Sequence, residues 1–272
     1  MSISFDRAVE YYDSTRGYPP EIAEAIGSAL IGATDATPQT RFLEVGVGTG
    51  RIALPIIARG HDYTGVDISA AMMSRLRAKL VDLERETGRP PSVRLLEADA
   101  QTLPFDSASF DVVLAVHVFH LVSDPRAAWH EAFRVLRPGG MLLICADAVA
   151  GGEPVSINEV WRDIVREARG QLPSSVESAT EVIRQIEAEY PGLPLDESRP
   201  VHWEFTRTAA EELDMIRGRK WSNTWALPDA MFESCVARLS AWCADQYAGR
   251  METPLPRRAE FVIRRVRRPV DR

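Results

Sequence analysis

The chain has 272 residues, 45% of them hydrophobic, so it is long and apolar enough to bury a globular core. Thirty-two basic against 39 acidic residues give a formal net charge of −7, which argues against a broad phosphate-binding surface and so against nucleic acid as the main partner. No run of about 18 apolar residues predicts a membrane span and the N-terminus lacks a signal-peptide pattern, so we expect a cytoplasmic protein.

The first 40 residues predict helices. We expect a leading helix around Arg7–Tyr12 and an amphipathic helix from Glu21 to Leu30. The segment Gly17–Pro20 separates them, because glycine and proline interrupt helical structure.

Short β-rich runs alternate with helical runs from about Arg41 to Asp147, which is the pattern of a doubly wound, mostly parallel α/β sheet. Helices are expected to begin near Gly50, Ser69 and Asp124, the last two as N-caps. Most of the five predicted strands are continuously apolar, as strands covered on both faces must be; they are residues 41–46, 62–67, 92–99, 110–118 and 141–147.

The pattern changes after residue 150. Residues 151–195 predict helices broken by Pro173 and Pro191, which suggests a helical cap inserted after the core. Two further strands, making seven, and two helices follow; the strands are residues 202–207 and 259–266, and the helices are residues 208–217 and 228–247. Seven arginines in the tail 257–272 predict a solvated edge strand or a contact with an anionic substrate.

A glycine-rich segment, LEVGVGTG, follows the first predicted strand. Gly46, Gly48 and Gly50 stand where the strand passes into a helix, which is where an open α/β sheet has its ligand crevice. Glycine lets the backbone turn tightly and approach a ligand. The spacing G-x-G-x-G is one residue shorter than the dinucleotide fingerprint, and by itself it is compatible with a purely structural turn.

Two carboxylates stand at the ends of the next two strands. Asp67 ends the second strand, where a carboxylate can accept both hydrogen bonds from a ribose diol. Asp99 follows the third strand and adds a further acceptor beside the same crevice. Each alone is also compatible with a helix or loop cap, but together with the glycines they predict an adenosine-shaped site.

Four segments, LEVGVGTGR, VDIS, EADAQTLPFDSASFDVV and RVLRPGG, carry a resemblance over about residues 41–147. In this order and approximate spacing they resemble the class I S-adenosylmethionine-dependent methyltransferases of type 11, in particular the group similar to ubiquinone and menaquinone biosynthesis methyltransferases. The N-terminal YYDSTRGYP also resembles a segment that folds over the cofactor in many relatives.

The resemblance implies S-adenosylmethionine as the cofactor and a role for each matched residue. Gly46, Val47, Gly48 and Gly50 would line the methionine part, and Glu44 would brace the loop from beneath. Asp67 would hold the ribose. Ile68, Asp99 and Ala100 would contact the adenine, His117 would lie near the sulfonium, and Tyr12 and Arg16 would close over the amino-acid end.

The same resemblance implies four regions. Residues 1–40 would form helices covering the cofactor site, and residues 41–150 the adenosylmethionine-binding core. Residues 151–200 would form the helical cap insertion. The C-terminal strands and helices of residues 201–272 would complete the sheet and the acceptor pocket.

The acceptor is expected to be a small molecule, because V-H-V-F-H stands where adenine and glutamine N-methyltransferases have N-P-P-Y or D-P-P-Y. Whether oxygen, nitrogen or carbon is methylated, and the oligomeric state, stay open. His117 and His120 are the candidate bases at the end of the fourth strand, because histidine titrates near neutral pH, and we expect His120 to be the catalytic one. No metal site is expected, since His117 and His120 lack carboxylate or cysteine companions.

The loop of residues 219–228, with Trp221 and Trp225, is a candidate lining of the acceptor site.

Two alternatives remain open at this point. An NAD(P)-dependent oxidoreductase would use a similar crevice, although the shortened glycine spacing counts against it. A non-catalytic adenosylmethionine-binding protein would keep the donor site without acceptor chemistry.

Overall fold

A computed structural model describes residues 2–150, 156–170, 184, 188, 193 and 195–270. The chain divides into two compact units, each described by itself. Unit 1 consists of Met1–Asp147, Ser178–Val201 and Phe261–Arg272, and unit 2 of Ala148–Glu177 and His202–Glu260.

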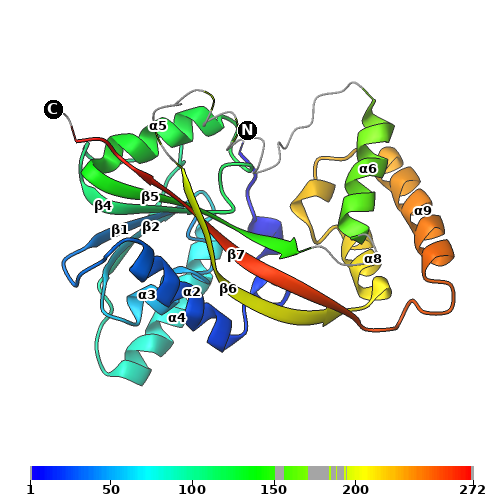
Figure 1. Ribbon diagram of the computed structural model, residues 1–272, viewed down its shortest axis with the longest axis horizontal. Coiled ribbons are helices and arrows are strands. Elements are labelled where there is room, and N and C mark those ends of the chain that lie inside the picture. The colour runs from blue at the N-terminus through cyan, green and yellow to red at the C-terminus, as the bar shows by residue number, and fades with distance from the viewer. Residues whose placement is uncertain are drawn as a thin grey trace. The chain divides into compact units, whose positions relative to one another are not determined.

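A sheet of seven strands in the order β3-β2-β1-β4-β5-β7-β6 organises the fold (Figure 1). The pairs β1–β2, β1–β4, β2–β3 and β4–β5 are all parallel, so the carboxyl ends of β1 to β4 meet at one edge. The strands are β1 (Arg41–Val45), β2 (Asp62–Asp67), β3 (Val93–Glu97), β4 (Phe110–Val116), β5 (Leu136–Ala150), β6 (Asp196–Arg207) and β7 (Leu255–Arg267).

Helices cover both faces of the parallel part of the sheet. Figure 1 shows α5 on one side and α2, α3 and α4 on the other. The face under α5 is a continuous apolar core around the buried Trp129. The elements are α2 (Pro20–Ala33), α3 (Ala53–Ile57), α4 (Ala70–Thr87) and α5 (Pro125–Val135).

The predicted doubly wound sheet is confirmed, and so are the two predicted N-caps. Ser69 Oγ accepts a hydrogen bond from the N–H of Met72 at 3.0 Å, and Asp124 Oδ1 accepts one from Ala127 at 3.0 Å. The fifth strand begins earlier than predicted, at Leu136. Leu136 is opposite Phe110 of β4, and regular pairing resumes only at Met141, because the Pro-Gly-Gly turn interrupts the register.

The expected leading helix around Arg7–Tyr12 is wrong. A short 3-10 helix, η1 (Asp6–Ala8), and a five-residue helix, α1 (Tyr12–Arg16), occupy this part of the chain. Aspartates in these elements bond to Thr49 and Ser69 of unit 1, so tertiary contacts determine where the helical turns lie.

Unit 2 is a cluster of helices. The helices α6 (Ile157–Arg169), α8 (Ala209–Arg217) and α9 (Asp229–Gln246) pack around the fully buried Trp161, with the short 3-10 helix η2 (Ser222–Thr224) beside them. The helix predicted after residue 151 is confirmed as α6, whereas Pro173 and Pro191 lie outside the described residues. Strand β6 begins at Asp196, within the stretch predicted to be helical.

The arginine-rich tail is not an edge strand, because β7 lies between β5 and β6. Its arginines pair with carboxylates of the neighbouring strand. Arg264 lies 2.8 Å from Glu197, and Arg258 lies 3.3 Å from Glu204. The charges of this strand therefore stabilise pairing within the sheet.

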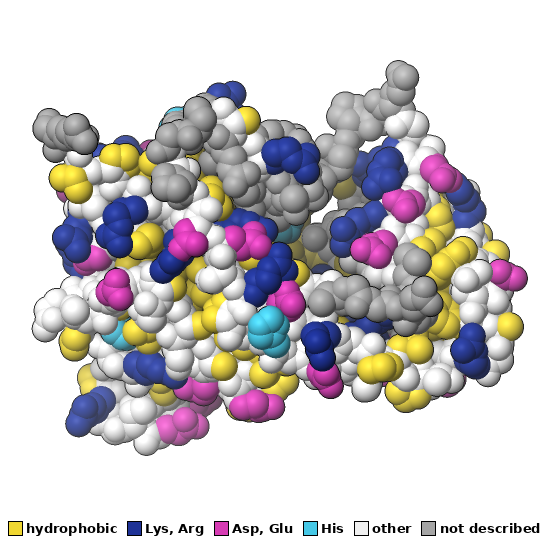
Figure 2. All heavy atoms as spheres, in the orientation of Figure 1, with side chains coloured by type: hydrophobic (Ala, Val, Ile, Leu, Met, Phe, Trp, Pro, Cys, Tyr) yellow, Lys and Arg dark blue, Asp and Glu magenta, His cyan; other side chains and the backbone are white. Residues whose placement is uncertain are grey.

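Figure 2 shows acidic and basic side chains interspersed on the face that it draws. Among the helices of the described residues, none combines the length and the apolar character that crossing a membrane requires.

Candidate functional site

The glycine loop turns sharply at the carboxyl end of β1. Gly46, Gly48 and Gly50 have φ of +72°, +54° and +82°, the left-handed region that favours glycine. A Cβ on Gly46 would clash with Val118, and one on Gly50 would clash with Leu76. On Gly48 it would meet only ordinary contact, 3.7 Å from Met72. Packing therefore favours glycine at the outer two positions, whereas at Gly48 only the positive φ favours it.

Asp67 joins this loop to the end of β2. Its Oδ2 accepts the N–H of Gly48 and its Oδ1 accepts the N–H of Ser69, both at 2.8 Å. Burial raises the pKa of Asp67, and these amide hydrogen bonds oppose that effect. The N–H of Ile68 also acts on this carboxylate, which can accept about four hydrogen bonds in all, so acceptor capacity remains for a ligand.

Glu44 lies beneath the loop as a buried acid. Its Oε2 accepts a hydrogen bond from the Tyr63 hydroxyl at 2.8 Å, and its exposed fraction is 2%. Burial raises the pKa of Glu44 from 4.5 to about 8, although the Tyr63 hydrogen bond and the charge of Arg51 oppose the rise. At neutral pH this side chain is therefore largely protonated.

The N-terminal segment is attached to the same region by polar contacts. Asp13 accepts a hydrogen bond from the Thr49 hydroxyl at 2.6 Å and pairs with Lys79 at 2.7 Å. Arg51 donates to the carbonyl of Arg16 at 2.7 Å. Tyr12, the other residue that the resemblance placed here, is half-buried and contacts the ring of Phe5. The segment therefore lies against the glycine loop.

Asp147, on β5, is the centre of a charged cluster that the sequence did not reveal. Its Oδ1 accepts the Tyr18 hydroxyl at 2.7 Å, while Arg51 and His117 lie 3.6 and 3.2 Å from its Oδ2. The Arg51 guanidinium also lies over the Tyr18 ring, 4.7 Å from its centroid. Burial alone would raise the pKa of Asp147, but His117, Arg51 and Tyr18 hold it well below its usual value.

The two histidines that follow β4 lie close together. The rings of His117 and His120 are 6.2 Å apart and nearly perpendicular. They line a cavity of about 10 Å³ together with Cys145 and Arg264, a volume near the minimum that holds one water molecule. Both candidates for acid–base chemistry therefore belong to one site.

Asp99 lies at the end of β3, but its carboxylate bonds locally. It accepts the backbone N–H and the side-chain amide of Gln101, both at 2.9 Å. Gln101 in turn accepts the N–H of Asp124 at 2.9 Å, which ties this loop to the start of α5. The predicted neighbours Ala100 and Ile68 are buried and half-buried beside these strand ends. Gln101 is a residue of this region that sequence reasoning missed.

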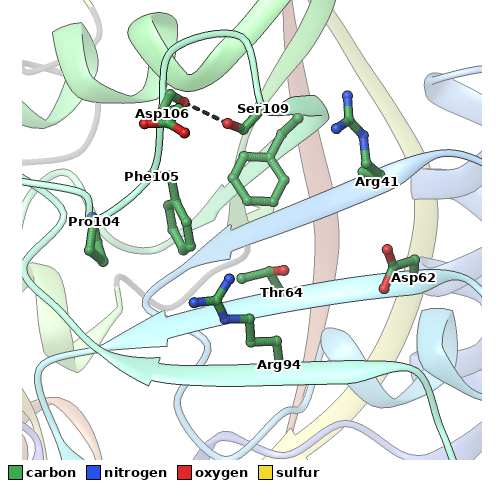
Figure 3. A pocket seen from close by; sticks show the side chains of 9 residues that line it. Arg41, Asp62, Thr64, Arg94, Pro104, Phe105, Asp106 and Ser109 are labelled. Carbon is green, nitrogen blue, oxygen red and sulfur yellow. Dashed lines mark hydrogen bonds between the residues drawn. The ribbon is translucent and has the colours of Figure 1, made fainter.

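A larger cavity of about 400 Å³ lies at the opposite end of the strands (Figure 3). Arg41 and Asp62 begin β1 and β2, and Arg94 lies near the start of β3 with its guanidinium over the Phe105 ring. Its lining is mostly exposed and carries both signs of charge. None of the predicted site residues lines this cavity.

The tryptophan loop of unit 2 is packed around Arg219. The indole Nε1 of Trp225 donates to the Arg219 carbonyl at 2.6 Å, and Trp221 is buried in the helical core. Arg219 lies over the Phe232 ring at 4.0 Å. Both tryptophans thus have structural contacts, and the predicted role in acceptor binding stays a prediction.

The structure thus brings Glu44, the glycine loop, Asp67 and His117 to one edge of unit 1 and adds three residues to them: Tyr18, Arg51 and Asp147. Such an edge can bind a polar ligand through backbone amides and a carboxylate, and it can move protons through an imidazole. Among the described residues, no cluster of histidine, cysteine and carboxylate side chains fits a metal ion.

Comparisons with known proteins agree with this arrangement. Residues 43–144 match the family model described as "Methyltransferase domain". An uncharacterized methyltransferase of Mycobacterium tuberculosis is 40% identical over 143 residues, which cover 52% of this chain and 51% of that protein. The match thus spans about half the length of this relative.

Two solved structures resemble the fold along nearly the whole chain. The [4+2]-cyclase SpnF has a TM-score of 0.58 at 19% identity, covering 98% of this chain and 94% of that one. A Haemonchus contortus phosphoethanolamine N-methyltransferase in complex with S-adenosylhomocysteine has a TM-score of 0.53 at 19% identity, covering 97% of this chain and 57% of that one.

Proposed function

We propose that this chain, which carries a class I S-adenosylmethionine-dependent methyltransferase domain over residues 43–144, transfers the methyl group of S-adenosylmethionine to a small-molecule acceptor. The observation that carries the proposal is the half-buried Asp67 carboxylate beside the glycine loop. Backbone amides fix its orientation, and a carboxylate, which can accept about four hydrogen bonds, keeps acceptor capacity for a ligand. A ribose hydroxyl is the group that an acidic residue at this position binds in nucleotide-binding folds.

The other proposed contacts with S-adenosylmethionine lie at the same edge of unit 1. Gly46, Val47, Gly48 and Gly50 would contact the methionine part, which fits a glycine loop that turns at the carboxyl end of β1. Ile68, Asp99 and Ala100 would contact the adenine, and His117 the region of the sulfur. Tyr12 and Arg16 would cover the amino-acid end, since their segment already lies against the loop.

When bound, S-adenosylmethionine supplies an activated methyl group, so the main task of the protein is to align the acceptor with it. Alignment of this kind contributes about 7 to 11 kcal/mol in favourable cases. An acceptor that arrives protonated also needs a base, and His120 is the residue that the sequence singles out for this role. The acceptor atom is oxygen, nitrogen or carbon. The C-terminal region 201–272 is the proposed source of the acceptor pocket.

The structural neighbours support the donor but leave the reaction open. The Haemonchus structure is a complex with S-adenosylhomocysteine, the product that S-adenosylmethionine leaves after methyl transfer. The SpnF neighbour is described as a cyclase, so this fold also carries a different reaction. A protein that binds the donor without transferring its methyl group is therefore the second candidate.

Calorimetry and a transfer assay test the proposal together. We expect S-adenosylmethionine and S-adenosylhomocysteine to bind to the wild-type chain and NAD not to bind. Asp67→Asn keeps the shape of the side chain but weakens the acceptor pair, so we expect about tenfold or greater loss of donor affinity. Binding of NAD without either adenosyl ligand would contradict the proposal. Donor binding without methylation of any acceptor in a broad panel would favour the second candidate.

A further inference from the structure

His117 has a backbone conformation that is uncommon for its residue type. Its φ is +56°, and its N–H donates to the Cys145 carbonyl of β5 at 3.0 Å. A residue other than glycine in this region carries strain of about 1 kcal/mol or more, which persists only where the surroundings hold it. The bend turns the chain at the end of β4 and brings the imidazole beside Asp147.

The ring nitrogen Nε2 of His117 has a partner at Asp147 in either protonation state. The backbone N–H of Asp147 lies 3.0 Å from Nε2 and suits a nitrogen with a free electron pair. The carboxylate Oδ2 of the same residue lies 3.2 Å away and suits a nitrogen that carries a proton. Asp147 therefore offers a partner to both tautomers of the neutral ring, the backbone N–H to a bare Nε2 and the carboxylate to a protonated Nε2, and it also pairs with the imidazolium.

Asp147 itself keeps its negative charge. The Tyr18 hydroxyl donates to Oδ1 at 2.7 Å, and the Arg51 guanidinium lies 3.6 Å from Oδ2. With these partners a proton that reaches the pair resides on the imidazole and not on the carboxylate. This is the arrangement in which a carboxylate orients a histidine and stabilises its charged form.

The other ring nitrogen of His117, Nδ1, has no hydrogen-bond partner within the described part of the chain. The side chain is 30% exposed, so the ring is accessible to a small molecule. The titratable and charged groups around it are Asp147, Tyr18, Arg51, His120, Cys145 and Arg264.

We propose that His117 is the general base of the methyl transfer and that Asp147 is its positioning residue. The proposal rests on the proposed function and places the base on His117 in preference to His120. Nδ1 takes the proton of the acceptor's O–H, N–H or C–H group, and the electron pair of that bond forms the new bond to the methyl carbon. The bond from the methyl carbon to sulfur breaks, its electrons stay on sulfur, and the imidazolium later gives the proton to water.

The proposal predicts the tautomer of the free enzyme, which can be measured without an acceptor. A base at Nδ1 requires the neutral ring to carry its proton on Nε2, facing Oδ2. We expect ¹⁵N chemical shifts of His117 at alkaline pH to show a protonated Nε2 and a bare Nδ1. In Asp147→Asn the carboxylate is lost and the backbone N–H remains, so the proton should move to Nδ1. A wild-type ring with its proton on Nδ1 would overturn the proposal.

His202 offers a matched control in unit 2. Its Nδ1 lies 3.5 Å from Glu260 Oε1, but its side chain is 52% exposed, so it is an exposed histidine–carboxylate pair. Glu260→Gln should leave the His117 spectrum unchanged. Movement of the proton in both variants would indicate a general effect of charge and contradict the specific pairing.

Kinetics then separate a base from a merely structural residue. For an acceptor that must lose a proton, such as a phenol, His117→Asn should lower kcat by about 100-fold or more. For an acceptor with a bare aromatic nitrogen, the same variant should keep kcat within about threefold, and His130→Asn, at an exposed position of α5, should leave both unchanged. Equal losses of kcat on both acceptors in His117→Asn would contradict the role of His117 as the base.

Calorimetry with S-adenosylmethionine distinguishes this failure from failure of the proposed function. If His117→Asn binds the donor as the wild type does and loses activity equally on both acceptors, only the assignment of the base fails. If the wild type binds no donor, the proposed function fails, whichever tautomer His117 has.

Discussion

The two units of the chain differ in how their buried polar groups are arranged. Unit 1 gathers partnered acids at the carboxyl edge of its strands: Glu44 with Tyr63, Asp67 with Gly48, and Asp147 with Tyr18. Unit 2 buries the apolar faces of three helices together with the ion pair of Glu212 and Arg257 at 3.9 Å, and its buried Trp161 Nε1 has no hydrogen bond within the described residues.

The difference shows which region is built to bind. A buried acid is costly unless it is paired, so several paired acids at the ends of neighbouring strands indicate a binding site. The ion pair and the isolated indole of unit 2 are more simply explained by packing. Changes at the strand ends of unit 1 should therefore alter donor binding, and changes in the helical core of unit 2 should mainly alter stability.

The largest expected effect is in unit 2. Trp161 is fully buried, and Trp161→Ala should lower the free energy of unfolding by about 3 to 5 kcal/mol. Trp161→Phe should cost less, since Nε1 has no partner among the described residues. Chemical denaturation measures both. Donor affinity should stay unchanged in the Phe variant, and a large loss there would break the separation between the units.

The glycine loop of unit 1 allows a comparison between packing and backbone conformation. Gly50 and Gly60 have nearly equal φ, +82° and +84°, but a Cβ would clash with Leu76 at Gly50 and meets nothing within 4 Å at Gly60. Gly60→Ala should cost about 1 to 2 kcal/mol from the backbone alone. Gly50→Ala should cost about 3 kcal/mol, because overpacking adds to the backbone term. Equal losses in denaturation would show that the loop relaxes around the new methyl group.

The raised pKa of Glu44, a buried residue of unit 1, predicts that the stability of the chain depends on pH. The folded chain holds a proton on this acid up to about pH 8, whereas the group releases it near the ordinary value of 4.5 when unfolded. The free energy of unfolding should therefore fall as pH rises between these values, by at most about 1.4 kcal/mol per pH unit. Above about pH 8 this contribution stays constant.

Glu44→Gln should remove that slope, because the amide does not titrate while its oxygen can still accept the Tyr63 hydroxyl. Glu131→Gln serves as a control of opposite sign. Arg134 donates to Glu131 and lowers its pKa, so its contribution is lost as pH falls. Denaturation at a series of pH values measures both effects. An unchanged slope in Glu44→Gln would show that Glu44 is not protonated in the folded chain at neutral pH.

The smallest expected effects concern helix caps, which both units share. Asp124 caps α5 in unit 1, and Thr208 caps α8 in unit 2 through a capping box with Glu211. Replacement of either cap by alanine should cost about 1 kcal/mol. The two losses should be alike in denaturation experiments, since a cap satisfies the same backbone donors wherever its helix packs. A much larger loss at either position would show that its side chain does more than cap the helix.

The local part of the candidate site could be predicted from sequence. A glycine cluster and an aspartate at two successive strand ends indicate where the chain turns, because glycine conformation and strand ends are local properties. Tyr18 and Asp147 could not be paired in this way, since 129 residues separate them along the chain. The positive φ of His117 likewise has no sequence signal, because β5 holds that bend through the Cys145 carbonyl.

The alternation of strands and helices, and with it the class of fold, is determined by the sequence itself, because periodicity and turn residues act over a few positions. The order of strands is not local, so only the tertiary structure decides that β7 lies between β5 and β6 and that its arginines pair within the sheet. The same holds for the charged cluster around Asp147. Its members come from four separate segments of the chain, and only folding brings His117, Arg51 and Tyr18 to Asp147, whose pKa they hold low.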